Sequence, residues 1–206
     1  MKRVLLSASF PSGDRGQSVA PYRPGDIGRA ASAVAEAVLR AGARLVFGGH
    51  PTISPLVLQI AGRLRAGNQV EIWQSDWYLD AVTPEVLRLV EHEHASLRRV
   101  KRGSDEPSSL ARLRDRMLKG DLTASFFVGG MEGIADEFRL LGRLHPTTPA
   151  FLFVEPGGMA SRLAGRADRP VGPGRVTALE GRGYAALTLQ ALRGVDLPVG
   201  DSPGEL

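Results

Sequence analysis

The amino-acid sequence predicts an α/β protein with a doubly wound, mainly parallel sheet and helices on both faces, as in Rossmann-like folds. Short apolar runs alternate along the chain with segments whose apolar residues recur at helical spacing, the pattern of successive strands and helices in such a sheet. Four of the apolar runs end in glycine or small hydroxyl residues. Open α/β sheets bind ligands at the carboxyl ends of their strands, so these runs also indicate a binding edge.

Chain length and composition favour a single domain. The chain has 206 residues, of which 43% are hydrophobic and 23% charged, enough for one full core. We see no internal repeat and no linker, so we expect one domain over residues 1–197. Residues 198–206 predict a disordered tail.

The first half of the chain predicts three strands joined by helices. The strands are expected at Val4–Ala8, Ala43–Phe47 and Gln69–Gln74. Asp26 is the expected N-cap of a helix that ends at Gly42. Ser54 and Pro55 are the expected N-cap and first residue of a second helix. The polar residues 14–25 are expected to cross the mouth of the sheet.

The second half predicts four further strands and the helices between them. The strands are expected at Arg98–Lys101, as a short edge strand, and at Ala124–Val128, Ala150–Val154 and Arg175–Leu179. The helices are expected at Pro84–Glu93, from a cap at Ser108 or Ser109 to Lys119, from Ile134 onward, and at Gly183–Leu192. The proline- and glycine-rich residues 166–174 predict a loop.

The stretch Thr123–Glu137 predicts the site around which the chain is organised. Gly129, Gly130 and Gly133 follow a buried strand directly, and glycines there let a ligand approach the backbone without meeting a Cβ. The first N–H groups of the helix that follows lack intrahelical partners and favour an anion. Glu137 lies one turn into that helix, at the edge of its inward face. An ordinary strand–helix turn with a solvated glutamate is the alternative.

Three other strand ends carry residues of the same kind. They are Ser7 and Ser9, then Gly48, Gly49 and His50, and finally Gly157 and Gly158. Because the carboxyl ends of parallel strands meet at one edge of a sheet, we expect these residues to surround one ligand. His50 either contacts that ligand or fills its own loop.

Arg114 does not fit an ordinary surface position. It falls within about 40° of the centre of the apolar face that Leu110, Leu113 and Met117 form on their helix. A buried charge without a partner is costly, so Arg114 needs an acidic partner or an anionic ligand, and Glu137 is a candidate partner. The alternative is an arginine that extends past the helix edge into solvent.

Composition and motifs exclude several classes of site. The chain has no cysteine, which excludes disulfides, a thiol nucleophile and thiolate metal sites. His92 and His94 alternate with two glutamates, but alternate positions on a helix point apart, so we expect no metal site. The sequence contains neither a Walker motif nor a G-x-S-x-G motif, and we expect no cofactor.

Charge and hydropathy bear on partners and location. The net charge is +4, but only three of the 26 basic residues are lysine and the arginines are scattered, so nucleic acid is not the expected partner. Trp73, Trp77 and Tyr78 either stack on a base or belong to the core. No apolar run approaches the roughly 20 residues needed to span a bilayer, and we expect a cytoplasmic protein with no membrane partner.

Two segments resemble a known superfamily. The segments 113–117 and 129–137 resemble the arginine helix and the P-G-G-x-G-T-x-x-E motif of the LOG proteins, which are cytokinin-activating phosphoribohydrolases. The segment 48–55 and the Gly-Gly-Met-Glu-Gly turn resemble a bacterial branch of the wider SLOG superfamily. That superfamily includes the DprA DNA-processing domain and sensor domains of antiviral conflict systems. The resemblance covers residues 4–163.

The resemblance implies roles for particular residues. Arg114 and Glu137 take the places of the catalytic arginine and glutamate, and the glycines at 129, 130 and 133 take the place of the phosphate turn. It also implies a homodimer. The chain departs from the motif because Val128 replaces the proline, an extra acidic residue enters the turn, and Ile134 replaces the threonine that contacts phosphate.

These departures favour a ligand whose phosphates are bridged, such as an ADP-ribose derivative or a cyclic nucleotide, over a phosphate monoester. The first hypothesis is therefore a domain that binds a nucleotide or nucleotide sugar and acts as a sensor, with bacterial defence as the setting that the resemblance suggests. The second is an enzyme that hydrolyses an N-glycosidic bond at the same site. The third is an interaction module with a vestigial crevice.

Overall fold

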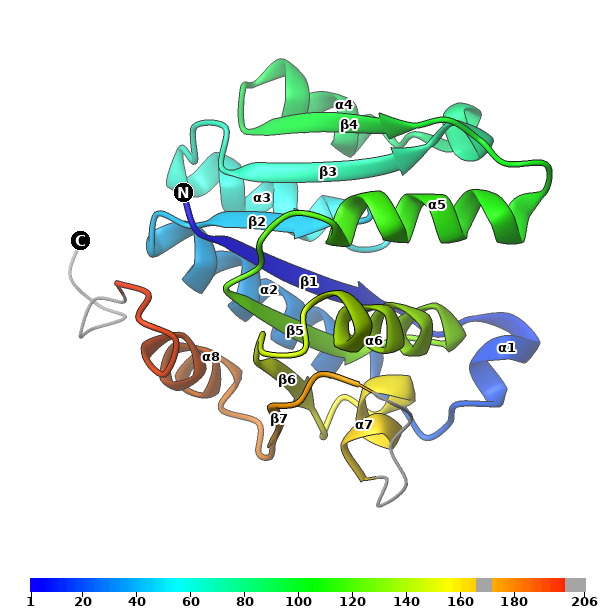
Figure 1. Ribbon diagram of the computed structural model, residues 1–206. Helices are drawn as coiled ribbons and strands as arrows, with labels where there is room; N and C mark the ends of the chain where they lie inside the picture. The colour runs from blue at the N-terminus through cyan, green and yellow to red at the C-terminus, as the bar shows by residue number, and fades with distance from the viewer. Residues whose placement is uncertain (166–171, 199–206) are drawn as a thin grey trace.

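The structure of the protein is a computed structural model, which describes residues 1–165 and 172–198. Its strands form a seven-stranded parallel sheet with helices on both faces (Figure 1), so the predicted fold class is confirmed. The strands are β1 (Arg3–Ser9), β2 (Arg44–Phe47), β3 (Val70–Ser75), β4 (Ala95–Val100), β5 (Ala124–Gly129), β6 (Ala150–Phe153) and β7 (Val176–Leu179).

The helices between these strands are short to medium in length. They are α1 (Gly13–Gln17), α2 (Pro24–Arg40), α3 (Ser54–Leu64), the 3₁₀ helix η1 (Asp76–Ala81), α4 (Pro84–Glu91), α5 (Glu106–Leu118), α6 (Glu132–Leu144), α7 (Gly158–Gly165) and α8 (Tyr184–Arg193). Within the described residues, no helix is both long and apolar enough to cross a membrane.

The strand order places a topological switch point at the centre of the sheet. The order is β4-β3-β2-β1-β5-β6-β7, so the chain builds outward from β1 to β4 and then returns to place β5 on the other side of β1. In this pair, Ser7 lies opposite Phe127 and Ser9 lies opposite Gly129. Crevices of doubly wound sheets form at such points, beyond the carboxyl ends of the strands.

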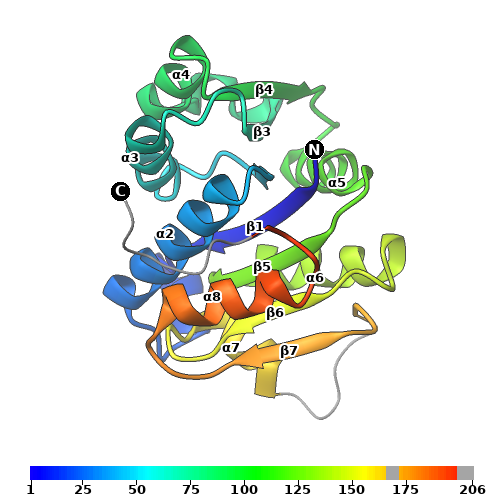
Figure 2. The ribbon, with the colours of Figure 1, turned by 90° about the vertical axis from the view of Figure 1, so that its left-hand side faces the viewer.

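The helices form two layers, and side chains alternate between them along each strand. On β5, where every residue is buried, Phe127 packs edge-on against Phe138 of α6 with ring centroids 5.5 Å apart. Phe126 faces the other layer and stacks on Phe151 at 5.1 Å. Helices α5, α6 and α7 cover the first face, while α2, α3, α4 and α8 cover the second, where α2 and α8 lie side by side (Figures 1 and 2).

The helix starts differ from the sequence predictions at three places. Asp26 is not an N-cap, because α2 begins two residues earlier at Pro24, and its buried carboxylate instead pairs with Arg29. Helix α5 is capped by Asp105, which accepts the Ser108 N–H at 2.8 Å in a capping box, so neither predicted serine is the cap. Ser54 is the first residue of α3, and its hydroxyl donates to a carbonyl of the preceding loop.

Some short elements were not predicted from the sequence. Helix α1 begins at Gly13 and extends into the polar residues 14–25, η1 follows β3 directly, and α7 begins at Gly158 in the turn after β6. Strand β4 is an edge strand as expected, although it begins three residues before Arg98. The predicted loop residues 166–171 and the predicted tail residues 199–206 lie outside the described part of the chain.

Candidate functional site

The turn after β5 needs glycine for conformational and packing reasons. Gly129 and Gly130 have positive φ angles of 62° and 72°, which residues other than glycine rarely adopt. A Cβ on Gly130 would lie 2.2 Å from Ile134 Cδ1, and one on Gly129 would lie 2.6 Å from Ile27 Cδ1. Both glycines are buried in this structure, so their own neighbours occupy the space that a ligand was expected to use.

The turn after β6 packs directly on this first turn. The Gly158 N–H donates to Pro21 O at 3.1 Å, and the Met159 N–H donates to Gly130 O at 3.0 Å. Gly157 forms a bridge with Tyr22. The loop before α2 therefore runs across the mouth of the sheet, as its polar sequence predicted, and it helps to cover the glycine turns. Contact of these glycines with a ligand stays a prediction.

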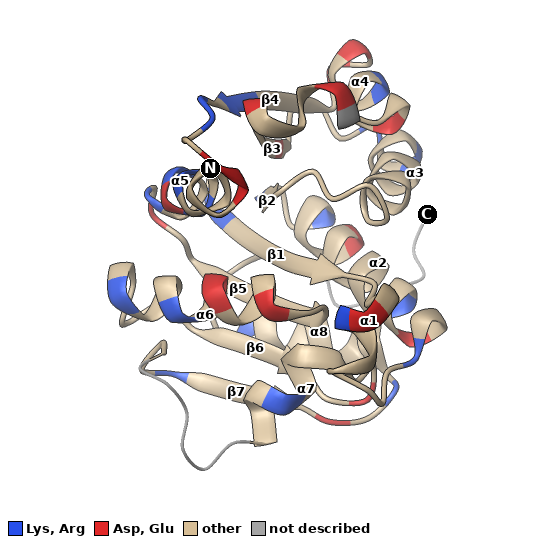
Figure 3. Ribbon diagram, turned by 90° about the vertical axis from the view of Figure 1, so that its right-hand side faces the viewer, with Lys and Arg blue, Asp and Glu red and all other residues tan. Residues whose placement is uncertain are grey.

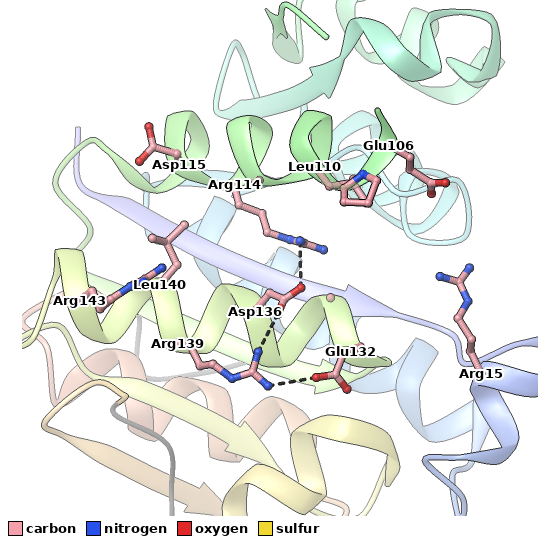
Figure 4. A pocket seen from close by; sticks show the side chains of 13 residues that line it. Arg15, Glu106, Leu110, Arg114, Asp115, Glu132, Asp136, Arg139, Leu140 and Arg143 are labelled. Atoms are coloured by element: carbon pink, nitrogen blue, oxygen red, sulfur yellow. Dashed lines mark hydrogen bonds and ion pairs between the residues drawn. The ribbon is translucent and has the colours of Figure 1, made fainter. Parts of the chain in front are cut away.

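The structure brings Arg114 and Glu137 together. The side chain of Arg114 extends from α5 toward α6 and is 16% exposed. Its Nη1 lies 3.0 Å from Asp136 Oδ2 (Figure 4). Its Nε lies 3.8 Å from Glu137 Oε1. Arg114 thus has two acidic partners, and the closer one is Asp136, which the sequence reading did not single out.

Gly133 provides room for the guanidinium. A Cβ at this position would lie 3.0 Å from Arg114 Nη2, tighter than nearly all real contacts of that kind. Gly133 lies in the first turn of α6, whose N–H groups have no intrahelical acceptor. The absence of a side chain at Gly133 therefore lets the Arg114 guanidinium lie against the helix start, a different reason for glycine from the one that the motif suggests.

Glu137 occupies an environment that disfavours its charged form. Burial raises the pKa of its carboxyl above the ordinary value, the nearby Ser7 hydroxyl and Arg114 oppose this rise, and Asp136 adds to it. Ser7 is 3% exposed, and among the described residues no group meets hydrogen-bond geometry with its Oγ. A carboxyl with a raised pKa beside an arginine and a buried hydroxyl is an arrangement suited to proton transfer.

A groove of about 1060 Å³ runs along α5 and α6 beside Arg114. Its charged lining residues balance in sign: four are arginines and four are acids, and they come from α1, α5 and α6 (Figures 3 and 4). They are Arg15, Arg114, Arg139 and Arg143 with Glu106, Asp115, Glu132 and Asp136. Pro107, Leu110, Ala111 and Leu140 provide apolar surface between them.

The Gly48–His50 segment forms its own local structure. His50 Nδ1 accepts the Thr52 N–H at 3.3 Å, which places the ring proton of the neutral form on Nε2. Burial lowers the pKa of His50, favouring the neutral ring. A Cβ on Gly49 would lie 2.9 Å from Gln74 Oε1, so this glycine permits a close contact with β3. These three residues are not among those that line the groove, and a ligand contact for them stays a prediction.

The aromatic candidates after β3 have different surroundings. Trp73 is half-buried, and its Nε1–H donates to Glu71 at 2.7 Å. Trp77 is 39% exposed. The Tyr78 hydroxyl donates to Glu106 at one end of the groove, and burial, followed by the Glu106 charge, raises the pKa of Tyr78 to about 12.

Sequence reasoning missed much of the charged network on α6. Arg139 donates to Asp136 at 2.7 Å and to Glu132 at 3.0 Å, which lie about one turn and two turns before it on the helix. The spacings of three and seven residues were available as a signal, because such positions share one side of a helix. Across the described residues, no group of three or more His, Cys, Asp or Glu side chains could hold a metal ion.

Comparisons with known proteins agree with this architecture. A solved structure named TM1055, determined by X-ray crystallography in a structural genomics programme, superposes with a TM-score of 0.59 at 17% sequence identity. The match covers 93% of this chain and 99% of the other, and at that identity it supports the fold alone. The search among curated proteins found no match. The model of the SLOG cluster3 family matches residues 25–190, and the chain therefore belongs to that family of the SLOG superfamily.

Proposed function

We propose that the protein binds a nucleotide or nucleotide sugar, of the ADP-ribose class, next to Arg114 and Glu137, and that it acts as a sensor of that ligand. The observation that carries the proposal is the approach of Arg114 to the start of α6 at Gly133, beside the switch point of the sheet. A guanidinium and the N–H groups of a helix start together favour the phosphate groups of a ligand.

Two further features support a ligand with sugar hydroxyls. The buried Ser7 hydroxyl lies beside the Glu137 carboxyl, and a hydroxyl can accept further hydrogen bonds from a ligand. Glu137, beside it, can accept hydrogen bonds from hydroxyls when it is ionised. The groove of about 1060 Å³ beside Arg114 is as large as the larger small-molecule pockets, which supports a ligand larger than a mononucleotide.

A second candidate is hydrolysis of an N-glycosidic bond, which the raised pKa of Glu137 favours. In that reaction Glu137 would take a proton from a water molecule while the water oxygen attacks the anomeric carbon. The bond between that carbon and the base breaks, and the base leaves with a proton from solvent. Arg114 would hold the phosphate. Turnover needs the ionised carboxylate, so activity would rise with pH through the raised pKa of Glu137.

One experiment separates the two candidates. The protein is incubated with AMP, NAD and ADP-ribose, free base is measured, and thermal unfolding is followed in parallel. A sensor predicts stabilisation without base release, about 2.7 kcal/mol at a ligand concentration of 100 Kd. An enzyme predicts base release that the Glu137→Gln variant loses. Absence of both effects for all three compounds would contradict the proposal and leave an interaction module.

The sensor role implies an assembly and a location. By resemblance to LOG proteins we expect a homodimer, which light scattering of the purified protein would test. The cysteine-free sequence suits the reducing cytoplasm, where a nucleotide-derived signal of bacterial defence would be sensed.

A further inference from the structure

Asp136 holds an unusual position between two arginines of the groove. Its Oδ2 lies 3.0 Å from Arg114 Nη1, and its Oδ1 accepts from Arg139 Nη1 at 2.7 Å (Figure 4). Each carboxylate oxygen therefore serves a different arginine. Arg139 has a further partner in Glu132, at 3.0 Å.

The two arginines differ in their surroundings. Arg114 is 16% exposed and lies between two carboxylates, whereas Arg139 is 41% exposed and lies on the outer side of α6. Asp136 itself is 40% exposed, so water can replace the bond that it makes to either arginine. Ion pairs with this degree of exposure contribute only about 0.2–1 kcal/mol each, and exchanging one for another costs little.

A phosphate that approaches Arg114 meets a guanidinium already engaged by carboxylates. The carboxylate of Asp136 both occupies Nη1 and repels an incoming anion at short range. Binding therefore requires Asp136 to move away, and the carboxylate needs a cation to receive it. Arg139 already contacts the other oxygen of the same carboxylate.

We propose that Asp136 is an exchangeable counter-ion of Arg114: the ligand phosphate displaces it from Arg114, and Arg139 retains it. Asp136 then limits the affinity of the site for anions, and Arg139 supports binding without touching the ligand. The inference rests on the proposed function, since it describes how the phosphate group of that ligand reaches Arg114.

The test is a double-mutant cycle read by calorimetric titration of ADP-ribose and AMP at fixed low salt. The Asp136→Asn variant is expected to bind about threefold more tightly, because an ion pair of this exposure no longer competes. The Arg139→Gln variant is expected to bind about threefold more weakly, because Asp136 then has only Arg114 to pair with. In the double variant, the loss caused by Arg139→Gln is expected to disappear.

One matched control variant lies outside the groove. Arg116→Gln makes the same change of net charge as Arg139→Gln, but Arg116 is an exposed residue of α5 that is not among those lining the groove, and binding is expected to stay at the wild-type value. None of the three substituted side chains is buried, so unchanged melting temperatures are expected to confirm folding.

Three results would overturn the inference, and they differ from failure of the proposed function. Weaker binding by Asp136→Asn would mean that Asp136 holds Arg114 in place for the ligand. A loss that persists when Arg139→Gln is added to Asp136→Asn would mean that Arg139 contacts the ligand itself. Unchanged binding by both single variants would remove any role for the exchange. If the wild-type protein and every variant bind neither compound, the proposed function fails and this inference falls with it.

Discussion

At the scale of single residues, the position of Arg114 depends both on the absence of a side chain at Gly133 and on the two acidic residues of α6 beside it. Asp136, 3.0 Å away, is the closer acidic partner of this mostly buried guanidinium, and Glu137 lies at 3.8 Å. Gly133 provides the space, because any side chain there would meet Arg114 Nη2. The three residues lie within five positions of one another on α6, so one helix start determines where the guanidinium lies.

Glu137→Gln is expected to stabilise the protein in a pH-dependent way. Burial raises the pKa of Glu137 in the folded state above the unfolded value. The wild-type protein therefore loses stability as pH rises from the unfolded pKa through the folded one, because the buried carboxyl must ionise. The variant has no such loss. Urea unfolding from pH 4 to pH 8 should show a stability difference that grows with pH, and a constant difference would contradict a raised pKa.

Gly133→Ala is expected to impair ligand binding more than folding. The new Cβ displaces the Arg114 guanidinium, and the loss of one hydrogen bond to a charged group corresponds to about tenfold in affinity. Gly62→Ala, at an exposed position in the last turn of α3 with no atom of the described residues within 4 Å of the new Cβ, is the control. It should raise the free energy of unfolding by about 0.5–1 kcal/mol and leave binding alone. Equal binding by both variants would show that Gly133 is not needed for the site.

The sequence predicted that Arg114 and Glu137 lie close together, but it did not predict which other charged residues surround them. Arg114 was identifiable because a charge fell among the core-facing leucines of a helix, and Glu137 because it bordered a glycine turn. Asp136 and Arg139 were not identifiable from the sequence, since charged residues on the outer side of a helix usually face water. Only the distance between α5 and α6, which no sequence pattern determines, makes Asp136 the closer partner of Arg114.

At the scale of elements, α6 connects the core to the site. Its inward face carries Phe138, which is fully buried and packs edge-on against Phe127 of β5. The residue before Phe138 is Glu137, so the packing of this aromatic ring fixes the turn of helix from which the carboxylate extends. The same helix thus carries a core residue and a candidate site residue at adjacent positions.

Phe138→Ala should therefore be among the more destabilising changes. Removing a buried phenyl ring from a packed core costs about 3–5 kcal/mol in the free energy of unfolding. Leu144→Ala, at a site that is 40% exposed near the end of the same helix, should cost less than about 1 kcal/mol. Chemical denaturation of both variants measures the difference, and similar midpoints would show that Phe138 does not anchor α6.

Element existence was easier to predict than element boundaries. The strands and long helices followed from apolar periodicity, which reports burial directly. The start of α5 could not be predicted in this way, because Asp105, Ser108 and Ser109 are all residues that favour the N-cap position. Which of them caps the helix depends on where the preceding loop leaves the sheet. Helix α1 has five residues and too few apolar positions to show a period.

At the scale of the whole molecule, Glu71 ties the first three strands together near their amino ends. It lies on β3, is 5% exposed, and accepts from Arg3 of β1 at 2.6 Å, while Arg44 of β2 lies 3.8 Å away. Burial alone would raise the pKa of Glu71, but hydrogen bonds from Arg3 and Trp73 and the two arginine charges outweigh it and lower the pKa. The carboxylate is therefore stabilising when ionised.

Glu71→Gln should make the fold less stable at neutral pH and less sensitive to acid. In the wild-type protein this stabilisation is present above the ordinary glutamate pKa of 4.5 and is lost as pH falls through the lowered, folded-state value. Because the substitution leaves two arginines without their carboxylate, it should lower the free energy of unfolding by about 2–4 kcal/mol at pH 7. Glu36→Gln, whose side chain is 33% exposed, should cost less than about 1 kcal/mol. Equal losses for the two variants in urea unfolding would contradict this account.

Arg114, set at the start of α6, is the residue proposed to receive the anionic group of a nucleotide-derived ligand. Calorimetric titration of ADP-ribose into the wild-type protein, Arg114→Gln and Arg116→Gln tests this role, since both variants remove one arginine from α5 and Arg116 is exposed. We expect Arg116→Gln to bind as the wild type does and Arg114→Gln to bind at least about tenfold more weakly. Equal affinity of all three proteins would rule out this role for Arg114.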